Sequence, residues 1–326
     1  MAATTIGNYD VIAKLVEGYV SANFTHDASL LSSGLVGTIP TENLSEGNTW
    51  QIRGDIQYHT AWQTPTAATD LTLRAISHYK DIGVILRRAD SFGFEDAARI
   101  AAGDTNALQR IGAIITDQIA YNLEDSFLQD LIPGVFNTGG PLDSDTYMVT
   151  ESESFKPEFI ASARKLHGAR GARLNRILMH PDVYYNAQID KLATGLDYDT
   201  ITRFNQTGMT YGGMYGGAMI LLNDRVYNSS GTYHTYLLRP GALALGYQKN
   251  LNMEADRDKL LAAGTDFVKY DMYYSPHIFG LTFSGSASTT IGGTTDAVLG
   301  TGSNWSTRTS VNASEIGIVA IETTEA

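Results

Sequence analysis

The chain has 326 residues, which at about 150 residues per domain allows one large or two ordinary domains. Charged residues make up 18% of the chain, fewer than the roughly 25% usual in soluble proteins. With 23 basic and 35 acidic residues the net charge is −12, which argues against a protein that binds nucleic acid by neutralising phosphates. The absence of cysteine excludes disulfides, thiolate metal sites and cysteine nucleophiles.

The first residues, MAATTIGNYDVIAKLVEG, contain neither a basic leader nor an uninterrupted apolar run, so we expect no signal peptide. No window of 18 residues is free of charged or strongly polar side chains, so we expect no membrane span and synthesis in a cytoplasm.

Residues 1–46 combine a short run with helical spacing of apolar residues and several turn residues, which predicts an arm. Residues 47–82 contain two segments that alternate apolar with polar residues around a Thr/Ala/Pro-rich stretch, which predicts a long hairpin. Because an isolated hairpin is marginally stable in water, we expect this one to lie against a neighbouring subunit.

A long helix is predicted over residues 105–132, with Asp104 as its cap and with Pro133 and Gly134 ending it. Its apolar residues fall on two seams, which indicates that the helix is covered on more than one side. The first seam holds Ile111, Ile115, Ile119 and Leu123, and the second holds Ile114, Tyr121 and Leu128.

Short strands alternate with helices over residues 156–249, which indicates an α+β module. Three further strands are predicted at 250–258, 266–275 and 277–284, returning to the long helix to form a sheet beside it. Beyond residue 285 the chain is rich in Gly, Ser and Thr, so we expect a loose tail with one docking strand at 316–321.

The glycine-rich run at 211–218 lacks the Lys-Ser/Thr of a phosphate-binding loop and is interpreted as a flexible loop. The seven histidines show no metal-ligand spacing, so neither a metal nor a cofactor is expected. His180 and Asp182 could belong to a hydrolase triad, but His180-Pro181-Asp182 fits a strand end followed by a helix that opens with proline better.

Two clusters of charged residues, one acidic and one basic, can each be interpreted in two ways. Three carboxylates, Glu254, Asp256 and Asp258, share one face of a predicted strand and could bind Ca²⁺ or Mg²⁺, although solvation or pairing across an interface is favoured. The basic residues could contact nucleic acid or form ion pairs with neighbouring subunits, which the net charge favours. These basic residues are Arg87, Arg88, Arg164, Lys165, Arg170, Arg173 and Arg176.

The order of these elements resembles the major capsid proteins of tailed bacteriophages, over residues 8–284. Six stretches carry the resemblance in the same order: SANFTHDASLLSSGLVG at 21–37, RRADSFGFEDAARIAAGD at 87–104, LIPGVF at 131–136, ILMHPDVYYNAQ at 177–188, TYLLRPGALALG at 235–246 and SPHIFGLTF at 275–283.

The resemblance implies an α+β tailed-phage major capsid fold. Its parts are an N-terminal arm at 1–46, an extended hairpin loop at 47–82, a peripheral domain at 83–155 with the spine helix at 105–132, an inserted axial domain at 156–249, return strands of the peripheral domain at 250–284, and a C-terminal tail at 285–326.

The resemblance also implies self-assembly into hexamers and pentamers that close an icosahedral virion shell around double-stranded DNA, without sequence-specific binding. Portal and scaffolding proteins would be its partners, with a decoration protein as an optional one and no membrane. An encapsulin-like shell around cargo enzymes is the alternative within this fold, and a hydrolase using His180 and Asp182 is the alternative outside it.

The residues predicted at subunit interfaces are Trp50, Arg53, Trp62, Arg74, Arg87 and Arg88. The two tryptophans are candidate anchors because large aromatic side chains dominate interface energetics, although both could equally pack within their own subunit. Some capsid relatives join subunits through a hairpin lysine and an asparagine, but residues 47–79 contain no lysine. We therefore expect a shell held by non-covalent contacts.

Overall fold

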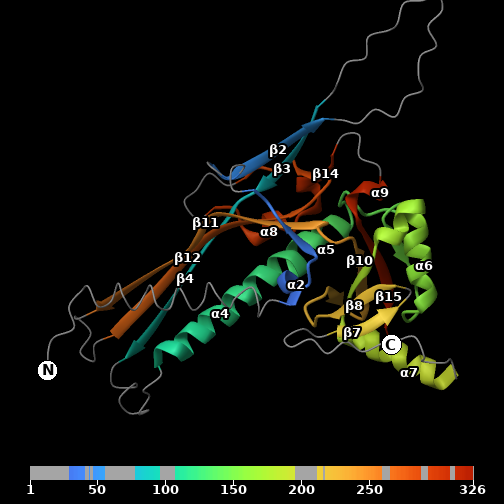
Figure 1. Ribbon diagram of the computed structural model, residues 1–326, viewed down its shortest axis with the longest axis horizontal. Coiled ribbons are helices and arrows are strands. Elements are labelled where there is room, and N and C mark those ends of the chain that lie inside the picture. The colour runs from blue at the N-terminus through green and yellow to red at the C-terminus, as the bar shows by residue number, and fades with distance from the viewer. Residues whose placement is uncertain are drawn as a thin grey trace, which may run out of the picture.

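The computed structural model describes residues 29–40, 44, 47–55, 78–95, 107–194, 211–215, 217–258, 265–287, 293–308 and 313–325. A long helix crosses a four-stranded sheet on one side of the molecule, and a second sheet with two helices forms the other side (Figure 1). The chain is therefore a mixed α+β protein, as predicted.

The long helix runs without a break through three segments: α4 (Ala107–Asp125), a π-helical segment η2 (Ser126–Leu131) and α5 (Ile132–Phe136). The predicted end at residue 132 is wrong by about one turn, because Leu131 and Ile132 keep helical dihedrals and Pro133 falls in the first turn of α5, where its missing N–H is tolerated. The predicted start and its cap Asp104 lie outside the described residues.

The two predicted seams of this helix differ in burial. Ile115, Ile119 and Leu123 of the first seam are buried, as predicted. In the second seam Ile114 is 53% exposed and Tyr121 is 56% exposed, whereas Leu128 is buried. The prediction of a second buried seam is therefore wrong for the α4 part. The π-helical segment changes the number of residues per turn, which rotates Leu128 onto the buried side.

The four-stranded sheet has the order β1-β11-β12-β4. Its strands are β1 (Val36–Thr38), β11 (Leu243–Asp258), β12 (Thr265–Ile278) and β4 (Leu86–Glu95). The strands predicted at 266–275 and 277–284 are instead one long strand, β12, and the short β13 (Leu281–Phe283). Pro276 does not interrupt β12 because the β4 ladder already ends at the Tyr274–Leu86 pair.

The second sheet has the order β5-β15-β10-β6-β8-β7, and β9 pairs with the first two residues of β10. Its strands are β5 (Met148–Thr150), β15 (Ile318–Thr324), β10 (Thr232–Leu238), β6 (Arg176–Met179), β8 (Ala218–Leu222), β7 (Tyr211–Tyr215) and β9 (Asn228–Ser229).

Both faces of this second sheet are buried. Alternate residues of a strand point to opposite faces, and Leu237 packs in the cluster with helix residues Phe159 and Ile160, whereas Tyr236 and Leu238 pack in the cluster that contains the long helix. The helices on the first face are α6 (Pro157–Leu166) and α7 (Pro181–Thr194), seen on the right of Figure 1. The sheet therefore joins two hydrophobic cores.

The segment beyond residue 285 is not the loose tail predicted. It contains α8 (Asp296–Leu299), η4 (Gly302–Asn304), β14 (Trp305–Thr307) and α9 (Ala313–Ile316) before β15. The predicted docking strand is β15, which lies inside the sheet, antiparallel to β10 and parallel to β5. Val319 and Ile321 are buried on one face while Ile318 and Ala320 are buried on the other, and this burial orders the segment.

The hairpin base consists of β2 (Thr49–Asp55) and β3 (His78–Val84), which pair antiparallel. It stands at the top of Figure 1, away from α7, and the tip at 56–77 lies outside the described residues. The remaining short elements are α2 (Ser29–Ser32) and the 3₁₀ helix η3 (Gly168–Arg173). In the described ranges no helix is long and apolar enough to cross a membrane.

Candidate interaction surfaces

The inward side of the hairpin base is attached to the body of its own chain through Trp50. This side chain is 3% exposed, donates from Nε1 to Ser275 Oγ at 2.5 Å, and meets the His277 ring edge-on with centroids 4.8 Å apart. A Cβ at Gly83, opposite Trp50 in the register, would collide with the indole. Trp50 therefore packs within its own subunit, which is one of the two alternatives that the sequence left open.

A buried ion pair joins the hairpin base to the C-terminal segment. Asp81 is 2% exposed, and its Oδ2 lies 3.1 Å from an Arg308 guanidinium nitrogen. The guanidinium also lies over the Tyr79 ring, 3.7 Å from the centroid. Burial raises the pKa of Asp81, and the positive charge of Arg308 acts in the opposite direction. Sequence reasoning missed this pair because its members are 227 residues apart.

The outward side of the hairpin base carries positive charge. The strand register places Arg53 directly opposite Lys80, and both side chains are exposed. Arg53 was predicted at an interface, whereas Lys80 was not. The alternation of apolar and polar residues along both strands is visible in the sequence and could have placed the two residues on the same face. The predicted interface residues Trp62 and Arg74 lie outside the described residues.

Arg87 and Arg88 lie on β4 and contact their own chain. Arg87 donates to Asn48 Oδ1 at 2.9 Å, and its guanidinium lies 5.0 Å from the centroid of the Tyr273 ring. Arg88 donates to the Thr294 carbonyl at 3.0 Å and pairs with Asp296 Oδ1 at 2.5 Å. Arg88 therefore joins the four-stranded sheet to the C-terminal segment.

Carboxylates gather next to Arg88, where the long helix meets α8. Asp125 pairs with Arg225 at 3.2 Å. Burial, together with the negative charges of Asp296 and Asp125, raises the pKa of Asp130 to about 6, although Arg88 opposes this shift. Within the described ranges no group of three or more histidine, cysteine, aspartate or glutamate side chains is placed to hold a metal ion.

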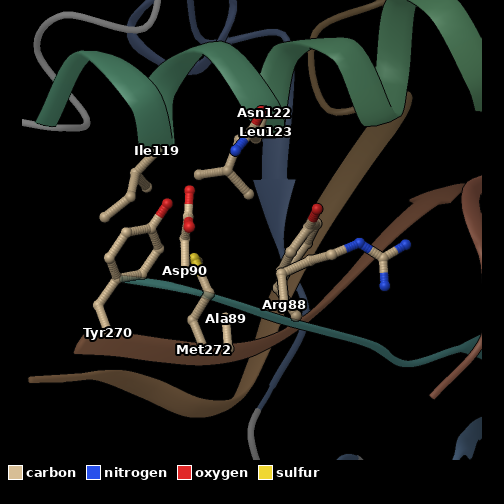
Figure 2. Close-up of a pocket in the computed structure, with 9 residues that line it drawn as sticks. Arg88, Ala89, Asp90, Ile119, Asn122, Leu123, Tyr270 and Met272 are labelled. Carbon is tan, nitrogen blue, oxygen red and sulfur yellow. The ribbon is translucent and has the colours of Figure 1, made fainter. Parts of the chain in front are cut away.

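A small cavity of about 90 Å³ lies between α4 and the four-stranded sheet. In Figure 2, Ile119, Asn122 and Leu123 reach it from the helix, and Arg88, Ala89, Asp90, Tyr270 and Met272 reach it from the strands. Pockets for nucleotides or drug-sized ligands usually have about 300–1,000 Å³. The cavity is a gap in the packing of the helix on the sheet.

The candidate hydrolase pair, His180 and Asp182, has a structural role. His180 follows β6, and its Nδ1 accepts the backbone N–H of Asp182 at 3.1 Å in the first turn of α7. Its Nε2 lies 3.4 Å from the Asn228 side-chain amide, and Tyr233 donates to Asp182 at 3.2 Å. The interpretation of this segment as a strand end followed by a helix that opens with proline is correct.

Three further clusters were singled out from the sequence, namely the glycine-rich run, the carboxylate cluster and the basic cluster. The glycine-rich run is not a loop over 211–215, because these residues form β7 and pair with β8. In the carboxylate cluster Glu254 is exposed, and the side chains of Asp256 and Asp258 lie outside the description. Of the basic cluster, Arg170 pairs with Glu315 at 3.1 Å.

The other four basic residues of that cluster lie on α6, on η3 and at the start of β6. Arg164 and Arg176 donate to the carbonyls of Leu174 and Asn175, which anchors both side chains to neighbouring backbone. Lys165 and Arg173 are exposed.

The fold is similar to solved phage capsid structures, although no family model and no curated protein matches the sequence. The structure titled "Capsid of Ralstonia phage GP4" is 11% identical, with 92% of each chain covered and a TM-score of 0.58. "Capsid of native GTA particle computed with C5 symmetry" is 12% identical, with 91% of this chain and 90% of that chain covered and a TM-score of 0.56.

A third structure, "Capsid structure of the Cyanophage P-SCSP1u", is 12% identical, with 89% of each chain covered and a TM-score of 0.51. The three similarities each extend over about nine-tenths of this chain. The predicted fold is confirmed at this level: the chain is a mixed α+β protein with the fold of phage capsid proteins.

Proposed function

We propose that this chain is the structural subunit of an icosahedral phage shell that encloses double-stranded DNA. The observation that carries the proposal is the similarity of the fold to capsid structures over about nine-tenths of the chain. The composition supports it, because a chain with a net charge of −12 repels phosphates and so leaves packaged DNA mobile on the inner wall.

The parts of the subunit follow from the same proposal. The hairpin at 47–82 extends toward a neighbouring subunit, and the peripheral domain combines the spine helix, made of α4, η2 and α5, with the four-stranded sheet. The axial domain is built on the second sheet with α6 and α7. The strands β5 and β15 pair within this sheet, so the axial domain draws on residues beyond 156–249.

Other partners follow from the function. For a phage shell we expect hexamers and pentamers of this chain, a portal at one vertex and a scaffolding protein during assembly. Closed symmetry lets one small chain build a large container through repeated contacts. We place Arg53, Trp62 and Arg74 at contacts between subunits, and the contacts of Arg87 and Arg88 with their own chain support a role within the subunit.

Electron microscopy of the purified protein tests the proposal. Expression with and without a scaffolding partner should give closed particles that sediment far above the 35.3 kDa monomer. A protein that stays monomeric in every assembly condition would contradict it. Nuclease-protected DNA inside native particles supports the phage shell, whereas enzymes in place of DNA would support the encapsulin-like alternative.

A further inference from the structure

Two positive charges face each other across the outward side of the hairpin base. The antiparallel register pairs Arg53 on β2 with Lys80 on β3. Directly opposite residues have Cβ atoms about 4.5–5.5 Å apart, and like charges at such positions destabilise a strand pair. Both side chains are exposed, so the hairpin keeps a repulsive pair that its own folding does not need.

The described neighbours do not neutralise this pair. Asp81, next to Lys80, is buried on the inward side, where it pairs with Arg308. Among the described residues, neither Arg53 nor Lys80 takes part in an ion pair.

The charge of the chain indicates what fits this surface. With 35 acidic and 23 basic residues, a second copy carries a net charge of −12. Complementary charges set the register of an interface and suppress wrong partners. A polyanion such as DNA fits less well, because the rest of the chain repels it.

We propose that Arg53 and Lys80 form a docking surface for a carboxylate-bearing face of a second copy of this chain. The inference rests on the proposed shell function and assigns a chemistry to one of its contacts. The contact is heterologous, because the hairpin base of one copy meets a different surface of the next copy. Heterologous contacts close into rings when the rotation between successive copies adds up to a full turn. Binding a carboxylate also removes the repulsion within the strand pair.

Zero-length cross-linking tests the contact directly. Particles are assembled from equal amounts of unlabelled and nitrogen-15-labelled chain and treated with a carbodiimide. The reagent condenses an amine with a touching carboxylate to an amide, and the water that is lost hydrates the carbodiimide to a urea. We expect Lys80 to be joined to an Asp or Glu peptide of mixed isotopic origin. Lys249–Asp271 and Lys156–Glu153, each 2.6 Å apart within one chain, are the intrachain controls and should give unmixed products.

The possible outcomes separate the two proposals. If particles form and both controls react, but Lys80 is unlinked or joined only within its own chain, the docking surface is refuted while the shell function stands. If the wild-type chain forms no particles, both proposals fail.

Charge variants provide the second measurement. The double variant R53E/K80E should lower particle yield about tenfold at low salt, where exposed charges are least screened, and R53Q/K80Q should lower it less. Thermal unfolding of the R53E/K80E subunit should stay at the wild-type temperature, because the variant replaces one exposed like-charged pair with another. Lys269→Glu, a charge reversal at another exposed lysine, is the matched control. Normal particle yield with altered DNA retention in R53E/K80E would overturn the proposal in favour of a nucleic-acid contact.

Discussion

Glycines at four positions bring the end of the long helix against the C-terminal segment. A Cβ built on Gly134 would lie 2.5 Å from the carbonyl oxygen of Gly300. A Cβ built on Gly302 would lie 2.5 Å from the carbonyl oxygen of Gly134 and 2.7 Å from the Cα of Gly140. The partners are backbone atoms, which cannot rotate away as a flexible side chain can. Only glycine allows this approach, and the sequence alone does not show which glycines face one another.

Substitution of Gly302 tests this packing. We expect Gly302→Ala to lower the free energy of unfolding by about 1–3 kcal/mol, because an added methyl group in a closely packed site forces the backbone to shift. Gly37→Ala is the matched control, since a Cβ there meets its nearest neighbour at 3.6 Å, an ordinary contact. Urea unfolding of the two variants measures the difference, and equal stability would contradict the packing.

Asp130 makes the stability depend on pH. Its pKa is raised to about 6 in the fold, first by burial and then by the charges of Asp296 and Asp125. A carboxyl whose pKa is raised in the native state contributes its full stabilisation below its pKa in the unfolded chain, which is about 3.8. This contribution is lost as the pH rises through the native pKa of about 6. At pH 7 the ionised Asp130 therefore lowers stability.

We expect Asp130→Asn to stabilise the subunit at pH 7 by about 1 kcal/mol, a value reduced because Asp130 is only half-buried and solvent screens its charge. The gain should disappear below about pH 4, where the wild-type carboxyl is protonated. Thermal unfolding at both pH values measures it. Asp145→Asn, at an exposed position, should change neither value, and a gain that persists at low pH would refute the electrostatic explanation.

The long helix was predictable as an element because apolar spacing is a local property of the sequence. Its end was not, since proline in a first helical turn and proline after a helix look alike in sequence. The exposure of Ile114 and Tyr121 was also not predictable, because which stripe is covered depends on the sheet packed against it. Neighbouring isoleucines on α4 therefore have different environments.

That difference gives a matched pair of variants. Ile115 is fully buried, whereas Ile114 is more than half exposed. We expect Ile115→Asp to lower stability by several kcal/mol because it buries an unpaired carboxylate, and Ile114→Asp to leave the isolated subunit close to wild type. Soluble yield and thermal unfolding measure both. Similar behaviour of the two variants would mean that the burial pattern of α4 is wrong.

The C-terminal strand shows why composition alone misjudged an element. The Gly/Ser/Thr-rich stretch before it predicts a loose tail, yet β15 pairs over seven positions with β10. These pairings join residues 80 to 92 positions apart in sequence, and strand partners at such separation leave no local signal. The packing of Trp50 within its own subunit left no local signal for the same reason, since its burial depends on Ser275 and His277 of β12.

At the scale of the whole molecule, the second sheet joins the two cores, and the hairpin base is held by Trp50 and by the Asp81–Arg308 pair. A subunit whose hairpin base is fixed in this way presents Arg53 and Lys80 in a defined direction. The repeated geometry of a shell requires such a defined direction, because each contact must recur with the same orientation.

The covalent state of mature particles tests how the proposed shell is held together. The chain has no cysteine, so disulfides between subunits are excluded, and no lysine lies between residues 47 and 79 to supply an amine from most of the hairpin. We therefore expect boiled particles to run on a denaturing gel as one band near 35.3 kDa, because denaturant removes every non-covalent contact. A ladder of larger species would contradict this expectation. If such a ladder disappeared in Lys80→Arg particles, the covalent bond would be assigned to Lys80 at the hairpin base.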